Sequence, residues 1–96
     1  MRRDWRAAVA KKEREGCCRV CGTTRELECA HIVPRSQVTV GGEDPRNIII
    51  LCAPCHRAQH AGRLELLGYL TYEEQGYVAS LVGLYEAMRR TTRMAA

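Results

Sequence analysis

The sequence predicts an α+β fold, because short strand-like segments in the middle of the chain are flanked by helical patterns. Residues 27–33 and 48–51 are rich in apolar side chains over lengths typical of strands. Residues 4–15 and 72–90 have the apolar spacing and the terminal signals of helices. No repeat, Gly/Ser-rich linker or membrane-length apolar stretch divides the chain, so we expect residues 1–96 to form one domain.

The composition indicates that this small domain needs more than its apolar core. Hydrophobic residues make up 46% and charged residues 27% of the chain, which is ordinary for a globular protein and argues against disorder. The chain has no Phe, one Trp and four Tyr, so few large rings are present to fill a core. Six cysteines are the obvious supplement, either as disulfides or as metal ligands.

The composition of the N-terminal segment predicts the cellular compartment of the protein and the charge of its partner. Residues 1–16 are charged throughout and lack the apolar stretch of a secretory signal, so we expect a cytoplasmic protein with metal-binding thiols. A basic helix is expected from Asp4 to Glu15, with Gly16 ending it. Residues 1–25 hold eight Lys and Arg against three Asp and Glu, a balance that suits nucleic acid. A solvated helix face has the same pattern, and the sequence leaves both open.

The middle of the chain is predicted to hold two strands separated by a long loop. The first strand ends at Pro34, and the second is a continuous apolar run that is too short for a helix. The loop 35–46 is long for a hairpin, and ordered loops of this length tend to be functional. Around the strands we expect cysteine turns at 17–22 and 52–55, Asn47 before the second strand, and a short helix from His56 to about Ala61 that Gly62 ends.

The last third of the chain predicts an amphipathic helix from about Tyr72 to Arg90. Thr71 and Glu74 match a capping box, in which each side chain bonds the backbone amide of the other residue. Two glycines in its interior each cost roughly 1 kcal/mol relative to Ala, so the helix is expected to depend on tertiary contacts. Its apolar side is interpreted as core packing, with a partner-binding or dimer face as the less favoured alternative. The apolar side holds Tyr77, Leu81, Leu84 and Met88, with Val78, Val82 and Tyr85 beside them, and the glycines are Gly76 and Gly83.

Two CxxC pairs predict a tetrahedral metal site. Thirty residues lie between the pairs, and two tight turns of this kind each offer two thiolates to one ion. Four thiolates suit Zn²⁺ and leave no position for a substrate, so the predicted role is structural. Buried reduced thiols are the less favoured alternative. The four predicted ligands are Cys18, Cys21, Cys52 and Cys55, whereas Cys17 and Cys29 have no assigned task.

Three histidines stand beside these elements. His56 and His60 share one helix face at the i, i+4 spacing of a metal-binding pair, although a solvated helix face has the same spacing. His31, at the end of the first strand, would on its own more often be a structural residue. The order of strand with His, long loop, Asn47, strand, CxxC and helix with His favours a catalytic site.

Over residues 18–60 the chain resembles the HNH endonuclease family, the zinc-supported branch of the ββα-metal nucleases. The resemblance implies a ββα-metal core over 17–62, between a basic N-terminal helix and a C-terminal helical extension over 63–96. It also implies metal-dependent hydrolysis of DNA, and it favours a phage, prophage or mobile-element origin. The matching segments are CRVCG, LECAHIVPRS and GGEDPRNIIILCAPCHRAQH, and the letters of the family name correspond to His31, Asn47 and His56.

Phosphodiester hydrolysis needs a base that activates water and a cation that neutralises charge on the phosphate. We expect His31 to be the general base, because an imidazole titrates near neutral pH. His56, together with His60, is expected to bind a catalytic divalent ion, either Mg²⁺, Mn²⁺ or another metal. Asn47 is expected to fix the loop and thereby His31, although a simple turn cap fits this residue equally well.

One position departs from the family pattern. Many HNH nucleases have Asp or His before the first histidine as an ion ligand, and here that residue is Ala30, which cannot bind metal. The ion would then depend on the two helix histidines, phosphate and water, or on a carboxylate such as Glu28, which shares the strand face of Ala30. The alternative is a catalytically inactive zinc-knuckle module that binds DNA or protein, for example as an accessory to phage DNA packaging.

The expected substrate is DNA held through its phosphates, with salt-sensitive affinity and little base recognition. No recognition helix can be identified, so we expect low sequence specificity or direction by a partner protein. One active site cuts one strand, which fits a nicking monomer or a weak homodimer that cleaves both strands. The expected DNA-binding residues are Arg2, Arg3, Arg6, Lys11, Lys12, Arg14, Arg35 and Arg57.

Overall fold

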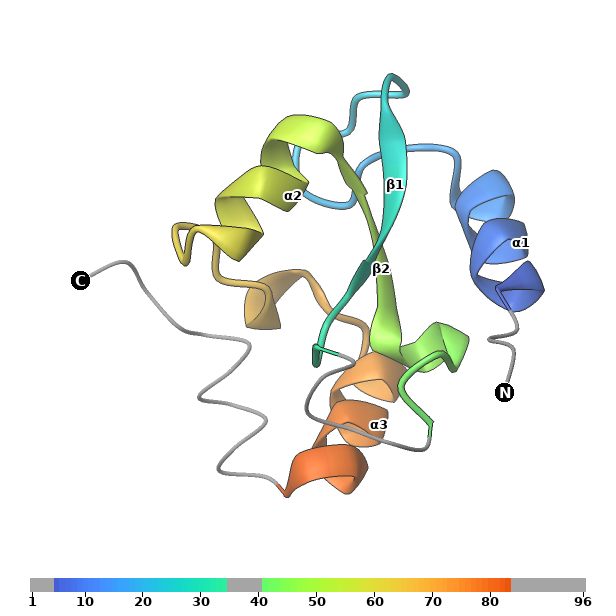
Figure 1. The fold of residues 1–96 in the computed structure, drawn as a ribbon, viewed down its shortest axis with the longest axis vertical. Helices are drawn as coiled ribbons and strands as arrows, with labels where there is room; N and C mark the ends of the chain where they lie inside the picture. The colour runs from blue at the N-terminus through green and yellow to red at the C-terminus, as the bar shows by residue number, and fades with distance from the viewer. Residues whose placement is uncertain (1–4, 35–40, 84–96) are drawn as a thin grey trace.

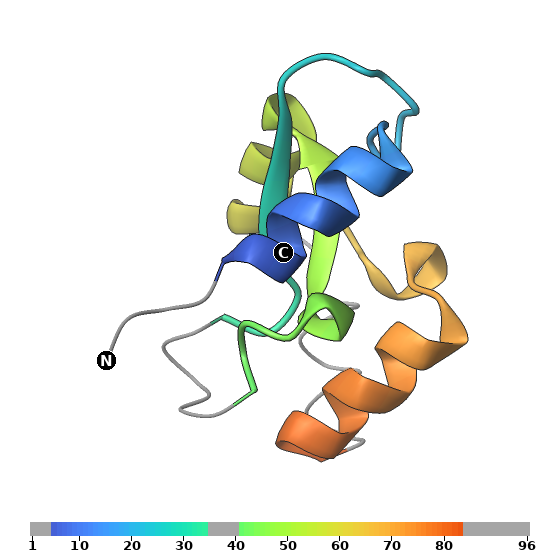
Figure 2. The same ribbon diagram turned by 90° about the vertical axis from the view of Figure 1, so that its right-hand side faces the viewer.

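The computed structural model describes residues 5–34 and 41–83 and confirms the predicted α+β class. Figure 1 shows a two-stranded sheet at the centre, and Figure 2 shows α1 and α2 on its two opposite faces. None of the helices in the described ranges is both long and apolar enough to cross a membrane. In chain order the elements are α1 (Arg6–Glu15), β1 (Leu27–His31), the 3-10 helix η2 (Pro45–Asn47), β2 (Ile48–Cys52), α2 (Ala53–His60), the 3-10 helix η3 (Leu67–Tyr69) and α3 (Tyr72–Val82).

The antiparallel pair of β1 and β2 forms the centre of the core. His31, at the end of β1, lies opposite Ile48 at the start of β2. Every residue of β2 is buried, as expected for an apolar strand that is covered on both faces. Ile48 and Ile50 pack against Ala8 of α1. The core on the other face contains Ala30, Ile49, Leu51, Leu66, Leu70 and Val78.

Helix α1 begins two residues after the predicted start and ends at Gly16, as predicted. Gly16 has a φ of 67°, a left-handed conformation that glycine adopts without strain, and its amide donates to the Lys12 carbonyl. Ala8 and Lys11 are both buried against the rest of the fold. The N-terminal helix is therefore packed on the sheet along one side, not solvated all round.

Helix α2 begins at Ala53, three residues before the predicted His56. Pro54 lies in its first turn, where a helix has no need of the amide that proline lacks. Cys55 is consequently part of the helix, whereas the sequence pattern predicted a separate turn over 52–55. The early start places the last cysteine and the two helix histidines on one rigid element.

Helix α3 has the predicted start but an earlier end. The Thr71 hydroxyl accepts from the Glu74 amide at 3.1 Å and the Glu74 carboxylate accepts from the Thr71 amide at 2.8 Å, which confirms the capping box. Gly83, with a φ of 83°, ends the helix after Val82, so its predicted place in the helix interior is wrong. Val78 is buried and Val82 packs against the core, which confirms core packing for that side of the helix, whereas Tyr77 and Leu81 are half-buried. The predicted positions Leu84, Tyr85, Met88 and Arg90 lie outside the described residues.

Candidate functional site

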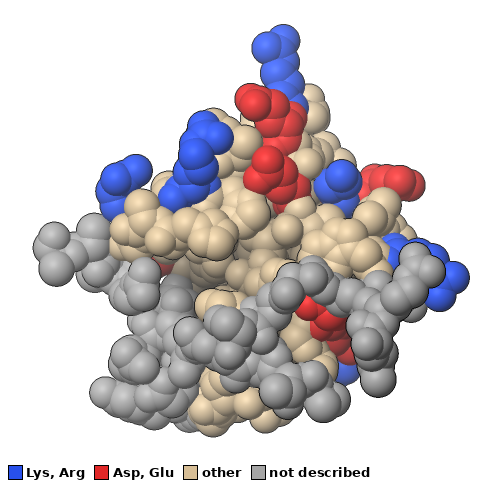
Figure 3. Space-filling view, viewed as in Figure 1, with Lys and Arg blue, Asp and Glu red and all other residues tan. Residues whose placement is uncertain are grey.

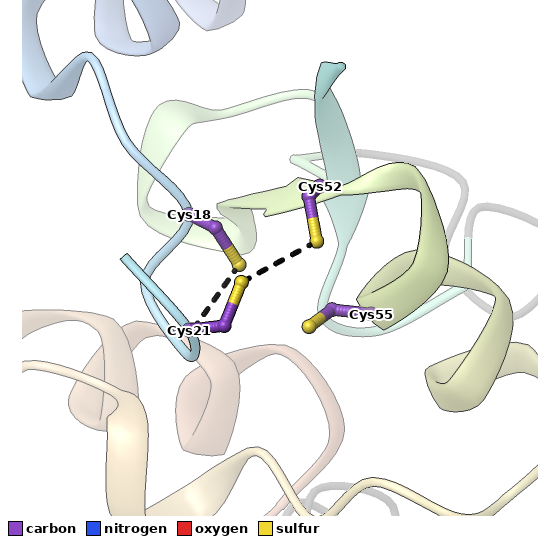
Figure 4. Close-up of side chains that lie close together, drawn as sticks. All are labelled: Cys18, Cys21, Cys52 and Cys55. Atoms are coloured by element: carbon purple, nitrogen blue, oxygen red, sulfur yellow. Dashed lines mark hydrogen bonds between the residues drawn. The ribbon is translucent and has the colours of Figure 1, made fainter. Parts of the chain in front are cut away.

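The four cysteines of the CxxC pairs converge on one point (Figure 4). Their Sγ atoms all lie within 4.8 Å of one another, and the Sγ atoms of Cys21 and Cys52 are 3.6 Å apart. Tetrahedral coordination with metal–sulfur bonds of about 2.3 Å places neighbouring sulfurs about 3.8 Å apart, whereas a disulfide would bring them to about 2.05 Å. The cluster therefore fits one tetrahedral ion and does not fit disulfides.

The cluster joins two distant parts of the chain. Cys18 and Cys21 lie in the turn between α1 and β1, Cys52 ends β2, and Cys55 lies in the first turn of α2. The turn is closed by the amide of Gly22, which donates to the Cys18 carbonyl at 3.0 Å, and Gly22 has a φ of 78°. An ion bound here would fasten the segment before β1 to the start of α2.

The thiols of the cluster differ in how readily they ionise. Burial alone would raise the pKa of the Cys18 thiol, but hydrogen bonds from the backbone amides around it outweigh burial and lower its pKa to about 6. For the Cys55 thiol, burial and hydrogen bonds to the neighbouring cysteines raise the pKa well above its ordinary value. Four thiolates can therefore coexist at neutral pH only when a cation balances them.

His31 is held by two groups from different parts of the fold. Its Nε2 lies 2.9 Å from Glu43 Oε1, and its ring lies against the indole of Trp5, with centroids 5.4 Å apart. The His31 side chain is 18% exposed, so part of it remains open to solvent. Because Nε2 is engaged by the carboxylate, Nδ1 is the nitrogen left to bind water.

Asn47 is fully buried and fastens the loop to the end of β1. Its Oδ1 accepts from the Val33 amide at 2.9 Å, and its Nδ2 donates to the carbonyls of Val33 and Gly42 at 3.1 and 2.8 Å. The local turn cap is instead Asp44, whose carboxylate accepts from the Arg46 amide. Asn47 thus fastens the loop at Gly42 to the segment that follows β1 at Val33.

His56 and His60 face each other on α2. Their Nε2 atoms are 3.1 Å apart and their ring centroids 4.8 Å apart. On the far side of the His56 ring, Nδ1 lies 2.7 Å from Glu28 Oε1 of β1. The three side chains form a row in which the carboxylate contacts one nitrogen of His56 and leaves the other toward His60.

Strand β1 separates the two histidine positions. His31 points toward α1, where Trp5 stands, and Glu28 points toward α2, in agreement with strand alternation. Within the described ranges His31 and His56 make no contact with each other. They are linked indirectly, because Gln59 Nε2 of α2 donates to the His31 carbonyl at 2.8 Å. This bond holds the ends of β1 and α2 together.

The predicted DNA-binding residues do not form one surface in the described part of the chain. The prediction for Lys11 is wrong, because its side chain is buried and its ammonium donates to Glu74 Oε2 at 2.6 Å and to the Pro45 carbonyl at 2.8 Å. Figure 3 shows Lys and Arg side chains scattered over one face with carboxylates between them. Of the others, Arg6, Lys12 and Arg14 lie on α1 and Arg57 lies on α2, across the sheet, while Arg2, Arg3 and Arg35 lie outside the described residues.

Two neighbours of His31 were not predicted as site residues. Glu43 stands in the predicted functional loop, four residues before Asn47, and a carboxylate in that loop is the only local signal for it. Trp5 is a lone tryptophan on a thin apolar stripe of a helix, which fits core packing equally well. The contacts of Glu43 and Trp5 with His31 depend on how the loop and α1 pack against the sheet. The spacing of residues along the sequence therefore does not predict them.

The comparisons with known proteins agree with this arrangement. Residues 18–62 match the family model described as HNH endonuclease. No curated protein and no solved structure shows a significant match to the chain. The matched segment contains both CxxC pairs, the two strands and α2, together with His31, Asn47 and His56. The match covers just under half of the chain and confirms the predicted resemblance of residues 18–62 to the HNH endonuclease family.

Proposed function

We propose that this protein is a metal-dependent DNA endonuclease that hydrolyses phosphodiester bonds with low sequence specificity. The observation that carries the proposal is the pair of carboxylate–histidine contacts that involve β1, one on each face of the strand. Glu43 holds His31 at 2.9 Å and Glu28 holds His56 at 2.7 Å. Imidazoles with one nitrogen fixed by a carboxylate are typical of bases and metal ligands.

In this proposal His31 removes a proton from the attacking water. Its side chain is partly open to solvent, and a histidine base typically contributes about 10² to 10⁴-fold to rate. Gln59 and Asn47 keep the end of β1 and the loop in place around it. A bound divalent ion would supply the charge that stabilises the phosphate during displacement.

His56 and His60 are the proposed ligands of that ion. Two nitrogens bonded to one metal at about 2.1 Å lie roughly 3.0 Å apart in octahedral geometry and roughly 3.4 Å apart in tetrahedral geometry. The 3.1 Å between their Nε2 atoms falls in this interval. Two imidazoles favour a transition metal such as Ni²⁺ or Mn²⁺ over Mg²⁺, which prefers oxygen. Ala30 offers no ligand, so phosphate and water would complete the shell.

Glu28 is proposed to orient His56 instead of binding the ion directly. Its carboxylate contacts Nδ1 and thereby fixes the proton on that nitrogen. The lone pair of Nε2 is then available to bind the ion. Glu28→Ala is therefore expected to weaken Ni²⁺ binding roughly 10- to 100-fold. Isothermal titration of the zinc-loaded protein measures this directly, without an activity assay. The exposed Glu65→Gln is the matched control, and equal Ni²⁺ affinity in Glu28→Ala and wild type would show that the carboxylate does not orient the ligand.

The four-cysteine cluster is proposed to hold one structural Zn²⁺. Four thiolates match the softness and tetrahedral preference of zinc and leave no open position for chemistry. The ion would keep α2, and with it His56 and His60, at a fixed place relative to β1. We propose that exposed arginines of α1 and α2 hold the phosphates of DNA. We also propose that the protein is associated with a phage or prophage and that a partner protein directs it to its site.

The test is the conversion of supercoiled plasmid to the nicked form by zinc-loaded protein with Mn²⁺, Ni²⁺ or Mg²⁺. EDTA is expected to abolish nicking, and His31→Ala is expected to slow it about 10² to 10⁴-fold, because the general base is lost. The exposed Glu13→Gln serves as the control. Nicking that persists at the wild-type rate in His31→Ala or in EDTA would exclude this mechanism.

A second candidate function is a zinc-supported module that binds DNA or protein without cleaving it. The observation that favours it is Ala30, which is fully buried and places no ligand beside His31. Under this alternative, folded zinc-loaded protein would bind DNA in a gel-shift assay but would nick it with none of the three metals.

A further inference from the structure

We propose that Glu43 is the positioning residue of His31, fixing the ring so that Nδ1 alone faces the attacking water. The inference rests on the proposed nuclease function for its catalytic meaning. Its structural content, the ring orientation and the site of the proton, can be measured without any activity.

The contact itself determines which nitrogen carries the proton. Glu43 Oε1 lies 2.9 Å from His31 Nε2, and both side chains are mostly buried, at 25% and 18% exposure. An ionised carboxylate only accepts hydrogen bonds, so a neutral His31 must carry its hydrogen on Nε2. The lone pair then remains on Nδ1, the nitrogen that a base needs.

The backbone on both sides of Glu43 is anchored, so the carboxylate has a defined position. The Gly42 carbonyl accepts from Asn47 Nδ2 at 2.8 Å, and the next residue, Asp44, caps η2. One residue earlier, the Gly41 carbonyl accepts from the Tyr77 hydroxyl of α3 at 2.9 Å. Gly41 has a φ of 86°, and a Cβ there would lie 2.5 Å from that hydroxyl, so only glycine fits the contact.

A second contact fixes the plane of the ring. Trp5 lies against the His31 ring at 5.4 Å between centroids and 31° between planes. The carboxylate holds one ring edge and the indole covers one face, which together limit rotation about the side-chain bonds. Positioning of this kind contributes to rate because a base must be aligned with its proton before the reaction begins.

In the proposed hydrolysis step, each proton and each bond that changes can be traced. Water gives one proton to His31 Nδ1, and its oxygen bonds to phosphorus while the bond from phosphorus to the leaving deoxyribose oxygen breaks. The leaving oxygen takes a proton from solvent, and the imidazolium later returns its own. While His31 is positive, the Glu43 carboxylate stabilises it in the way that an acidic partner stabilises an imidazolium base.

The first experiment locates the proton by ¹⁵N NMR of protein labelled at histidine, above the titration range of imidazole. Wild type is expected to show a protonated Nε2 and an unprotonated Nδ1 at His31. Glu43→Met removes the acceptor and is expected to give a mixture of the two His31 tautomers. Glu43→Gln keeps an acceptor oxygen and is expected to give a fraction of the Nε2-protonated tautomer between those of wild type and Glu43→Met. A wild-type proton on Nδ1, or no change in Glu43→Met, would overturn the proposal. Circular dichroism checks that each variant is folded.

The second experiment is a double-mutant cycle in the plasmid assay. Glu43→Met is expected to slow nicking about tenfold or more, but less than His31→Ala does, because Glu43 acts only through the base. Glu43→Gln should recover part of this loss, while in the His31→Ala background Glu43→Met should have no further effect. Losses that simply add would show that Glu43 acts independently of His31. An absence of nicking by wild type would defeat the nuclease function alone, because the NMR result still decides the orientation.

Discussion

Cys52→Ser is expected to release the bound zinc and to unfold most of the protein. Cys52 is buried at the end of β2, and its Sγ lies 3.6 Å from that of Cys21. Zinc binding in small peptides contributes about 10 to 16 kcal/mol at neutral pH, comparable to the whole stability of about 5 to 15 kcal/mol of a small domain. A core without Phe has little stability with which to compensate.

The measurements are zinc content by mass spectrometry and helicity by circular dichroism. Wild type is expected to hold one Zn²⁺ per chain, and Cys52→Ser less than a tenth of that under the same purification, an order-of-magnitude expectation from the lost ligand. Cys17→Ser is the matched control, because Cys17 is adjacent to the cluster but outside it. Removal of zinc from wild type with a strong chelator should reproduce the unfolding. A chelated wild-type protein that keeps its helicity and melting temperature would contradict the structural role.

The four-cysteine cluster is also the part of the site that the sequence predicts best. Two residues between ligands force both side chains to one side of a tight turn, so Cys18 and Cys21 come together whatever the rest of the chain does. The same holds for His56 and His60, because residues four apart on a helix are neighbours. These contacts are local, and local contacts follow from spacing.

The contacts that the sequence does not predict join segments far apart in the chain. Glu43 meets His31 across the loop, and Glu28 meets His56 from strand to helix. Strand alternation correctly places Glu28 on the face of Ala30, but only the structure shows that its oxygen contacts Nδ1 of His56. The distinction changes its proposed role from ion ligand to orienting residue.

Two errors in the elements have local physical causes. Pro54 favours a turn when taken with its neighbouring cysteines, yet proline is well tolerated in the first turn of a helix, and α2 starts there. Gly83 is compatible with a helix interior at a modest cost, yet its positive φ makes it the end of α3. In both cases one residue type has two common uses, and tertiary packing selects between them.

Lys11 is the clearest case of tertiary context overriding a sequence pattern. A lysine on a basic helix is almost always solvated, because an unpaired ammonium is costly to bury. Here its ammonium donates to Glu74, 63 residues away, and to carbonyls of η2 and β2. Glu74 also accepts from Arg19 at 2.8 Å. This charge cluster joins α1 and α3 to the core, as expected if residues 5–34 and 41–83 belong to one domain.

Lys11→Met is therefore expected to destabilise the protein by about 3 to 5 kcal/mol, the usual cost of removing one partner of a buried ion pair. Methionine preserves the length of the side chain, so the loss comes from the two carbonyls and from the buried Glu74, which keeps only Arg19 as its cationic partner. For a domain of this size the melting temperature should fall by more than about 10 °C. Thermal unfolding followed by circular dichroism measures the change, with Lys12→Met on the same helix as the control. A fall no larger than that of Lys12→Met would show that the pair contributes little.

The pH dependence of stability tests the same cluster from the acidic side. Burial alone would raise the pKa of Glu74, but hydrogen bonds from Arg19 and Lys11 outweigh burial and lower its pKa to about 2. A carboxyl whose pKa is lower in the folded state stabilises the fold above the unfolded pKa and loses that effect as the pH falls through the folded value. Glu74 is only 3% exposed, and its contribution at neutral pH is roughly 3 kcal/mol.

Wild type should consequently lose more stability than Glu74→Gln between about pH 5 and pH 2, the interval between the two pKa values. Glutamine is suitable because it also serves at the third position of a capping box, so the start of α3 is kept. Acid weakens zinc binding in both proteins alike, so the difference between their unfolding free energies isolates Glu74. Denaturant unfolding at a series of pH values gives that difference, and parallel curves would mean that the Glu74 carboxylate is not stabilised by Lys11 and Arg19.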